Sequence, residues 1–561
     1  MKKILFAILI LLPVFSIQAQ TKKAITHEDL WSLKRVGAPQ ISPDGNYVLV
    51  SVLEPSYDEK EKISDLWITT TDGKGTPRRL TTGKSSESGY SWSPDGKYIA
   101  FSAKREGDDV PQLYLLNFKE GGEAQRFTNL STGASNPVWS PDGKRIAFLS
   151  EVFPGALTDS ANKKIAADRK ALKYKARVYT TYPIRNWDSW NEDKQVHLFV
   201  QDVSENSTAK DLFAGTEFVS KIGYSGEGMS LTWTPNGKQI VFNATENFTE
   251  AAYADVISNL YLISSNGSEP KKLTTDGNHY GSSQISNDGK WLYFLTNKSI
   301  PNSGFEYTLT RIGRTSFPEF GNNEILTADM DQSVNGYKLS ADGNSIYFTV
   351  EQETADRFYM MNSEGKKRLQ LTEVNGGSYP SFSVSNNDVL VAGYESATMP
   401  AEIVRIDMKK KNHVSLTSFN QKKLSELDLI PLKHFWMTSS KGKKIHSLMV
   451  MPPNFDPNKK YPLFVLIHGG PHIAMKDNFS YRWNYHLLAQ PGYVLIMTNY
   501  TGSTGYGEKF AQDIQVEASA STSSISMTIC SFFRPNCICG TPKHRRNARY
   551  LPVNTPIFTT N

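Results

Sequence analysis

A short turn motif recurs along this chain at intervals of about fifty residues, and it constrains the fold more than any other feature. The tetrapeptide Ser-Pro-Asp-Gly begins at residues 42, 93 and 140, and looser copies begin at residues 234, 286, 340 and 385. Serine, proline and glycine stand at the positions where a type I turn favours them. The repetition therefore predicts one small structural unit that is built several times over.

Each copy of the turn is followed by the pattern of a half-buried strand. Ile99 and Phe101 follow one copy, and Ile240 and Phe242 follow another, so apolar residues alternate with period two. A second strand pattern and a closing turn come next. A unit of this size with several strands matches a propeller blade, and such blades must pack in a ring to cover their apolar faces. The sequence predicts a mainly β chain with a seven-bladed β-propeller over residues 20–430.

The spacing breaks once, between the copies at residues 140 and 234. Residues 155–177 lie in this gap, and they are rich in lysine and charged throughout. We interpret this segment as a helical insertion from one blade, although the gap is long enough for an eighth. Calcium ligation is an alternative role for the repeated aspartates, but no run has the spacing of a calcium loop, so turn chemistry is the favoured interpretation.

The first residues have the composition of an export signal. Lys2 and Lys3 precede an apolar stretch from Ile4 to Ile17, and Ala19 offers a small-residue cleavage site. This arrangement is typical of a secretory signal peptide over residues 1–19, cut after Ala19. The apolar stretch is too short to span a bilayer comfortably, since a span takes about 20 residues. We expect a periplasmic or secreted protein with no membrane contact after signal cleavage.

Charge and cysteine are both concentrated at the ends of the chain. The formal net charge is +6, but residues 1–19 and 516–561 together account for it, so the body carries no net field that would attract nucleic acid. All three cysteines, Cys530, Cys537 and Cys539, lie near the C-terminus, and their spacing with His544 matches no standard zinc site. We expect no metal and no organic cofactor.

The sequence pattern changes near residue 430. A predicted hairpin over residues 435–451 is followed by a continuous apolar run at residues 463–467 and a second at 493–497. Continuous runs suit strands that are buried on both faces of a mostly parallel sheet. Residues 431–515 are therefore predicted to be the N-terminal part of an α/β-hydrolase domain.

A loop with two glycines follows the first of these predicted strands. His468, Gly469 and Gly470 stand directly after the apolar run. Glycines let backbone N–H groups approach a substrate oxygen closely, and in α/β-hydrolases the loop at this place supplies one N–H of the oxyanion hole. The alternative is a simple turn, but the position between two apolar strands favours the oxyanion-hole loop.

The combination resembles the prolyl oligopeptidase family of serine peptidases, in its bacterial dipeptidyl peptidase and acylaminoacyl peptidase branch. The most specific matches are residues 452–456 with Tyr461-Pro462 and 468–472, followed by residues 499–507, and the resemblance covers roughly residues 20–515. It implies a propeller that filters access to a hydrolase domain, which cleaves short peptides near their N-termini through an acyl-enzyme. It also implies an oxyanion N–H from Gly469, with His468 and Gly470 shaping the loop. Glu192 is a candidate contact for a peptide amino group, against the plainer interpretation of an ordinary blade edge.

The resemblance does not extend to the catalytic triad. This fold needs Gly-x-Ser-x-Gly and then an Asp and a His, yet the 561 residues contain no Gly-x-Ser-x-Gly. Ser225 and Ser503 each lack one of the two glycines. We expect residues 516–561 to be a non-homologous, disordered tail, as a frameshift or an alternative terminus would produce. The predicted strand at 493–497 is then expected to form an apolar sheet edge, and the chain as written is expected to be inactive.

Two other classes of function fit parts of the sequence. A propeller that only binds peptides or proteins, similar to the TolB-type propellers, would share the repeats but would not carry the hydrolase start at residues 435–507. A pseudoenzyme kept for peptide binding would carry both. Short peptides are the expected partners in either case. Side-chain preference, exo or endo cleavage and oligomeric state are not indicated by the sequence.

Overall fold

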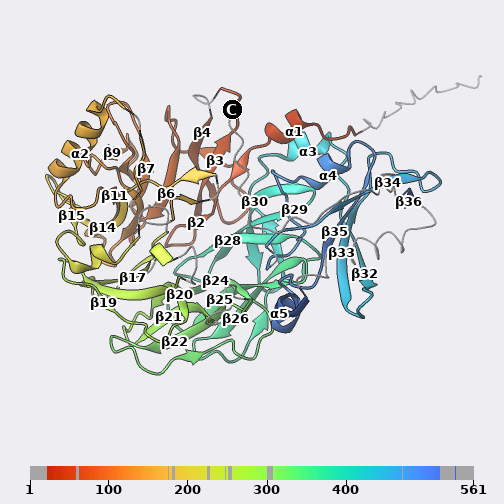
Figure 1. Ribbon diagram of the computed structural model, residues 1–561. Helices are drawn as coiled ribbons and strands as arrows, with labels where there is room; N and C mark the ends of the chain where they lie inside the picture. The colour runs from red at the N-terminus through yellow and green to blue at the C-terminus, as the bar shows by residue number, and fades with distance from the viewer. Residues whose placement is uncertain are drawn as a thin grey trace, which may run out of the picture.

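The computed structural model describes residues 22–58, 62–174, 176–179, 183–186, 188–223, 228–246, 248–250, 256–299, 307–470, 472–517 and 537–538. The predicted signal peptide and Ser225 lie outside these residues, as does most of the tail. Figure 1 shows a ring of small sheets on one side and a further sheet, with helix α5, on the other. The prediction of a mainly β chain is confirmed.

Seven antiparallel sheets make up the ring within the described residues, and each is built from consecutive strands except the third, which the β12–β13 hairpin interrupts. The first three are β1 (Arg35–Val36), β2 (Gln40–Ile41), β3 (Tyr47–Glu54), β4 (Ile63–Thr70) and β5 (Arg78–Arg79); β6 (Glu87–Trp92), β7 (Tyr98–Ala103), β8 (Gln112–Asn117) and β9 (Gln125–Arg126); and β10 (Ser135–Trp139), β11 (Arg145–Val152), β14 (Gln195–Asp202) and β15 (Lys210–Asp211). We number these sheets as blades one to seven in chain order.

Blades four to seven follow without interruption. They are β16 (Leu231–Trp233), β17 (Gln239–Thr245), β18 (Ser258–Ser264) and β19 (Lys271–Lys272); β20 (His279–Ile285), β21 (Trp291–Asn297), β22 (Arg311–Ser316) and β23 (Glu324–Ile325); β24 (Val334–Leu339), β25 (Ser345–Gln352), β26 (Ala355–Asn362) and β27 (Leu369–Gln370); and β28 (Ser378–Val384), β29 (Leu390–Ser396), β30 (Met399–Asp407) and β31 (Asn412–Ser415). In blades two to seven the strands pair in chain order, whereas in blade one β1 and β2 both pair with β3.

The repeated tetrapeptide forms the same turn in each blade. In blade three, Ser140 Oγ donates to Asp142 Oδ1 at 2.6 Å, and the Lys144 N–H donates to the same oxygen at 3.1 Å. The Arg145 N–H donates back to Ser140 Oγ at 2.9 Å. Gly143 has a φ of 69°, the left-handed conformation that glycine adopts without strain. The hydroxyl and backbone donors hold the pKa of the Asp142 carboxyl below its usual range.

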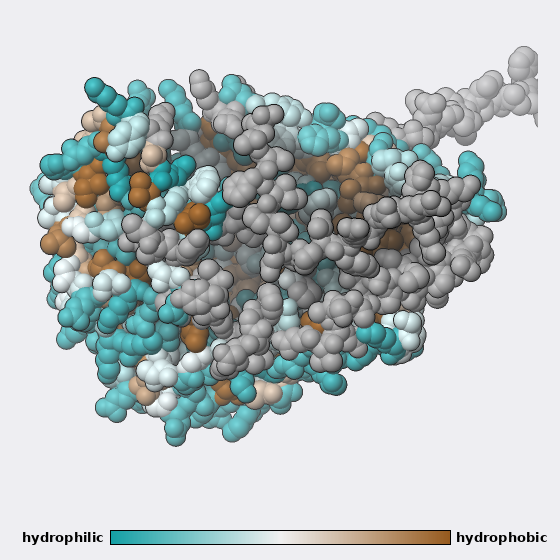
Figure 2. All heavy atoms as spheres, viewed as in Figure 1, coloured by the Kyte–Doolittle hydropathy of each residue, from teal (hydrophilic) through white to brown (hydrophobic). Residues whose placement is uncertain are grey.

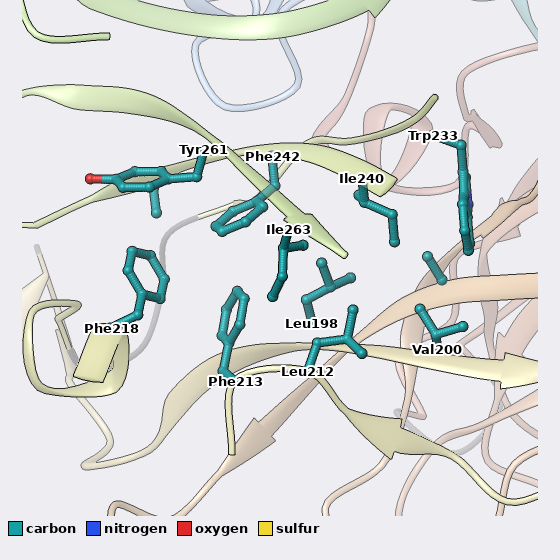
Figure 3. Close-up of a cluster of buried hydrophobic side chains, with 12 residues drawn as sticks. Leu198, Val200, Leu212, Phe213, Phe218, Trp233, Ile240, Phe242, Tyr261 and Ile263 are labelled. Atoms are coloured by element: carbon teal, nitrogen blue, oxygen red, sulfur yellow. The ribbon is translucent and has the colours of Figure 1, made fainter. Parts of the chain in front are cut away.

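Apolar side chains between neighbouring blades form the propeller core. Figure 3 shows Leu198 and Phe213 of blade three facing Phe242 and Tyr261 of blade four. The ring closes in the same way, because Ile41 of blade one packs with residues of blade seven. The Ile41 N–H also donates to Ser383 Oγ of blade seven at 3.2 Å. Each blade is therefore covered on both faces by its neighbours.

The long gap in the repeat is an insertion in blade three. It leaves after β11 and holds helix α2 (Asp159–Ala171) and the short hairpin of β12 (Arg185–Asn186) and β13 (Ser189–Trp190). Thr158 caps α2, since its hydroxyl accepts the Ala161 N–H at 3.2 Å. Short helices elsewhere are α1 (His27–Trp31), η1 (Glu217–Ser220), η2 (Phe248–Glu250) and α3 (Gln421–Ser425).

A separate sheet follows the seventh blade. Its strands are β32 (Lys433–Thr438), β33 (Lys444–Val450), β34 (Tyr461–Leu466), β35 (Val494–Asn499) and β36 (Cys537–Ile538), and its helices are α4 (Tyr485–Ala489) and α5 (Glu508–Glu517). The order across the sheet is β32-β33-β35-β34-β36. β32 and β33 form the predicted hairpin, while β34 and β35 are parallel.

Two expectations about this sheet are wrong. The strand predicted at residues 493–497 is not an edge, because β35 lies between β33 and β34. The run at 463–467 is not buried on both faces, since Phe464 is 38% exposed and Ile467 is 36% exposed. The only neighbour of β34 on its outer side, among the described residues, is the two-residue strand β36. The strand order contains a crossover, and this crossover decides which strand lies outside. No local sequence pattern encodes it.

The length and hydropathy of the helices indicate whether any of them could cross a membrane. In the part of the chain that the structure describes, no helix is long and apolar enough to cross a membrane. Figure 2 shows a largely hydrophilic surface over the propeller side, with apolar side chains scattered across it.

Candidate functional site

The His-Gly-Gly loop is fixed to the neighbouring strand through His468. The His468 ring stacks on Tyr500 with centroids 4.4 Å apart, and the Tyr500 hydroxyl donates to the His468 carbonyl at 2.7 Å. His468 is buried, and burial lowers the pKa of its imidazole, so the ring is neutral near pH 7. A neutral stacked ring holds the loop at the end of β34.

The two glycines of the loop have different environments. A Cβ on Gly470 would stand 2.9 Å from the His472 backbone nitrogen, and its φ of 121° suits glycine. A Cβ on Gly469 would meet nothing within 4 Å. Gly470 is therefore needed for the shape of the loop, whereas Gly469 is exposed and has room for a side chain.

A serine–histidine pair lies beside this loop. His468 Nε2 is 2.8 Å from Ser503 Oγ, which is within the reach of a nucleophile and its base. Ser503, however, is 0% exposed, so no substrate carbonyl can reach its oxygen in this conformation. The pair joins the two loops that follow β34 and β35, and it acts as a structural hydrogen bond.

A large cavity lies where the propeller meets the hydrolase sheet. Its volume is about 760 Å³. The innermost strands of blades four to seven line it together with the segment after the His-Gly-Gly loop, and the lining residues include Thr232, Gln284, Asn335, Asp356, Ser381, Glu395, Ala474, Lys476 and Asn478. Polar and apolar atoms share its wall. The size is that of a small-molecule or short-peptide site.

Lys476 connects the two parts of the molecule at this cavity. Its ammonium lies 3.0 Å from Asp356 Oδ1 and 3.5 Å from Glu351 Oε1, both on blade six. Burial alone would lower the pKa of Lys476, but the two carboxylates outweigh burial and raise it. Burial raises the pKa of Glu351, whereas Lys476 acts in the opposite direction. The half-buried cation is therefore matched by carboxylates from the propeller.

The next residue fixes the same segment from the other side. Asp477 accepts the Gly377 N–H at 2.8 Å and the Ala397 N–H at 2.7 Å, both from blade seven. The Asp477 N–H donates to the Thr354 carbonyl at 2.8 Å. These charge-assisted bonds hold residues 476–477 rigidly across the mouth of the propeller.

Glu395 is the most strongly perturbed acid that faces this cavity. Burial raises the pKa of its carboxyl to about 7, and the nearby charges of Asp356 and Asp477 add to the shift. The Phe479 N–H and Lys476 act against it. A carboxyl with this pKa changes its charge near neutral pH, which is a property of functional sites.

The proposed amino-group contact lies elsewhere. Glu192 belongs to the insertion of blade three, is largely exposed and pairs with Arg177 at 3.4 Å. It is not among the residues that line the cavity. The structure therefore brings His468, Gly469 and Gly470 together at one loop but does not bring Glu192 to the cavity.

Sequence reasoning missed the charged residues of the cavity. Lys476 and Asp477 stand a few residues after the His-Gly-Gly loop, and an adjacent cation and anion at that place was the available signal. Asp356 and Glu395 are carried on blade strands and had no signal, because a single acid in a strand pattern usually faces solvent.

Two family models match this chain. The TolB beta propeller domain matches residues 12–153, and the prolyl oligopeptidase family matches residues 479–524. Dipeptidyl-peptidase 5 of Porphyromonas gingivalis is 27% identical over 88% of this chain and 70% of its own length. Dipeptidyl-peptidase 5 of Porphyromonas endodontalis is 28% identical over 89% of this chain and 70% of its own length.

Solved structures share the fold. The acylaminoacyl peptidase of Pyrococcus horikoshii has a TM-score of 0.69 at 19% identity, covering 91% of this chain and 73% of that one. A puromycin hydrolase has a TM-score of 0.59 at 15% identity, covering 90% of this chain and 72% of that one. At this identity the likeness concerns the fold: a propeller together with a hydrolase domain.

Proposed function

Because this chain belongs to the prolyl oligopeptidase family of serine peptidases, we propose that the cavity between its propeller and hydrolase sheet binds short peptides near their N-termini. Export through the signal peptide at residues 1–19, to the periplasm or beyond, is part of this proposal. The dipeptidyl-peptidase and acylaminoacyl peptidase relatives support the peptide as the substrate class.

The observation that carries the proposal is the shared lining of the cavity. Its wall combines the inner strands of four blades with Ala474, Lys476 and Asn478 of the hydrolase part. Polar side chains such as Ser381 and Asn335 line the cavity, and a peptide backbone needs donors and acceptors of this kind when it leaves water. A propeller that bound its partner on an outer face would not need this joint wall.

The His-Gly-Gly loop is not part of the cavity lining, but it lies a few residues before Ala474, Lys476 and Asn478, which are. Gly469 is exposed, and its N–H is the donor that we propose for a carbonyl oxygen of the bound peptide. Cleavage also needs a nucleophile and a base. The 561 residues contain no Gly-x-Ser-x-Gly, and Ser503 is enclosed. We therefore propose that this polypeptide, as given, binds such peptides and does not hydrolyse them.

Peptide binding is tested by fluorescence anisotropy with a labelled tetrapeptide whose N-terminus is free. Ser381→Trp places an indole in the cavity wall and should weaken binding at least tenfold. Lys163→Trp, on the exposed side of α2, is the matched control and should bind within twofold of the parent. Equal affinity in the Ser381→Trp and Lys163→Trp proteins would refute the cavity as the binding site.

Hydrolysis is tested separately with a fluorophosphonate probe. We expect no stoichiometric labelling of a serine in the 561-residue polypeptide, because its sequence contains no Gly-x-Ser-x-Gly. Labelling of one serine at unit stoichiometry would contradict inactivity while leaving peptide binding intact.

A propeller that serves only as a binding module is the second candidate. The match of residues 12–153 to the TolB beta propeller domain favours it. It differs in the expected site, since binding would then survive Ser381→Trp and be lost on changes to an outer blade surface.

A further inference from the structure

A second cavity lies at blade three and shares no lining residue with the first. Its volume is about 460 Å³. It lies between the loop at residues 154–157, which follows β11, and the segment at 214–223, which follows β15, and β14 contributes two side chains to its wall. Nothing in the proposed peptide-binding function uses this cavity.

The wall of this cavity is mostly apolar and uncharged. Pro154, Ala156, Leu157, Val219 and Ile222 supply the apolar part, and no aspartate, glutamate, lysine or arginine is among the described lining residues. A charged ligand would lose its hydration there without gaining an opposite charge. The wall therefore favours a neutral molecule with an apolar body.

Two polar atoms in this wall lack hydrogen-bond partners. They are His197 Nε2 and Gln195 Oε1, and neither has a partner in the part of the chain that the structure describes. Both side chains are more than nine-tenths buried. His197 and Gln195 are two residues apart on β14, so they project from the same side of the strand. Buried polar atoms are nearly always paired in native proteins, so these two point to a missing ligand.

The partners of each side chain show that both free atoms accept hydrogen bonds. His197 Nδ1 is 2.8 Å from Asp211 Oδ2, and the other Asp211 oxygen accepts the Phe213 N–H at 2.9 Å. A carboxylate oxygen accepts, so Nδ1 is the donor in this pair, and in the tautomer that carries its proton on Nδ1 the lone pair is on Nε2.

Hydrogen bonds also fix the orientation of the Gln195 amide. Its Nε2 donates to the Val219 carbonyl at 2.9 Å and to the Ile222 carbonyl at 3.2 Å. Its Oε1 is therefore left as an acceptor at the cavity. A ligand that matches this site must bring the donors, since the protein supplies only acceptors there.

We infer that this cavity binds a neutral, mostly apolar molecule that ends in a hydroxyl group, such as a small phenol. The hydroxyl donates to His197 Nε2, and the apolar body lies against Leu157, Val219 and Ile222. The site is independent of the peptide-binding cavity, and it needs no covalent step.

The test compares 4-bromophenol with bromobenzene, which has the same ring and bromine but no hydroxyl. Calorimetric titration should show that 4-bromophenol binds at least tenfold more tightly. In crystals soaked with 4-bromophenol, the anomalous bromine signal should lie in the cavity, with the phenol oxygen at hydrogen-bond distance from His197 Nε2. Equal affinity for the two probes, or a bromine signal only outside the cavity, would overturn the inference.

Variants separate the hydrogen bond from the shape of the cavity. His197→Leu should reduce the affinity for 4-bromophenol about tenfold and leave that for bromobenzene unchanged. Gln195→Leu serves as a second variant if His197→Leu does not fold. Ser220→Ala is the matched control, because the Ser220 hydroxyl lines the cavity but already donates to the Glu217 carbonyl. A parent-like affinity in both leucine variants would refute the assignment of the two acceptors.

Discussion

The strands of the propeller and the outer strand of the hydrolase sheet both carry large apolar side chains, yet these are buried to different degrees. In blade six, Ile346 and Phe348 of β25 are both fully buried, because blades five and seven cover the two faces of the sheet. In β34, Phe464 is 38% exposed, and β36 pairs only with Tyr461 and Pro462. Burial follows from the number of neighbours rather than from composition.

The same contrast exists within the hydrolase sheet. All six residues of β35 are buried between β33 and β34, whereas none of the six residues of β34 is fully buried. Both strands come from continuous apolar runs. A ring of blades supplies neighbours to every strand by symmetry, while an open sheet always leaves its outer strands with fewer contacts.

The largest expected effect comes from truncating one phenylalanine in each region. Phe348→Ala removes a fully buried ring from blade six and should lower the free energy of unfolding by about 3–5 kcal/mol. Phe464→Ala removes a ring that is already in contact with water and should cost about 1 kcal/mol or less. Urea unfolding followed by circular dichroism measures both. Similar losses in the two variants would break the comparison.

The propeller could be predicted from the sequence because the residues that specify each blade are close together in the chain. Each Ser-Pro-Asp-Gly turn with the alternating strand after it, such as residues 140–148, specifies its own place in a blade. The position of β34 was not predictable in the same way. The strand order β33-β35-β34 is set by a crossover between distant segments, and an apolar run carries no signal about its neighbours.

The candidate site shows the same division between local and distant information. The His-Gly-Gly loop at 468–470 could be recognised, since a strand and a glycine pair are adjacent in sequence. Lys476 and Asp356 are in contact although they lie 120 positions apart in the chain, and no periodic pattern in the sequence predicts this contact. Glu192 was proposed from the family resemblance, and it is not among the residues that line the cavity, because it belongs to the insertion of blade three, where it pairs with Arg177.

The pH dependence of stability tests the contact between the propeller and the hydrolase sheet, where the Glu395 carboxyl lies. Burial raises the pKa of Glu395 from 4.5 to about 7, so the folded protein binds this proton more tightly than the unfolded chain does. The contribution of Glu395 to the free energy of unfolding is therefore greatest below pH 4.5, and it falls as the pH rises from 4.5 to 7. The loss over this window should be about 3 kcal/mol or less.

Glu395→Gln is the variant that isolates this effect. The amide stays neutral at every pH, so the variant should be more stable than the parent at pH 8 and similar to it at pH 4.5. Chemical unfolding at the two pH values measures the difference. A parent and variant that keep the same difference in stability at both pH values would show that Glu395 titrates normally in the folded protein.

The smallest expected effect concerns the repeated turn itself. Asp142→Ala removes the acceptor for Ser140 Oγ and for the Lys144 N–H, and it should cost about 1 kcal/mol. Asp142→Asn should cost less, because Asn236 of blade four already fills the same position and accepts from Thr234 Oγ1 at 2.8 Å. Thermal unfolding of the two variants measures the difference. Equal losses would show that the carboxylate charge, rather than the shared acceptor geometry, stabilises the turn. The turns with Asp142 and with Asn236 would then be stabilised differently, although the two blades share one fold.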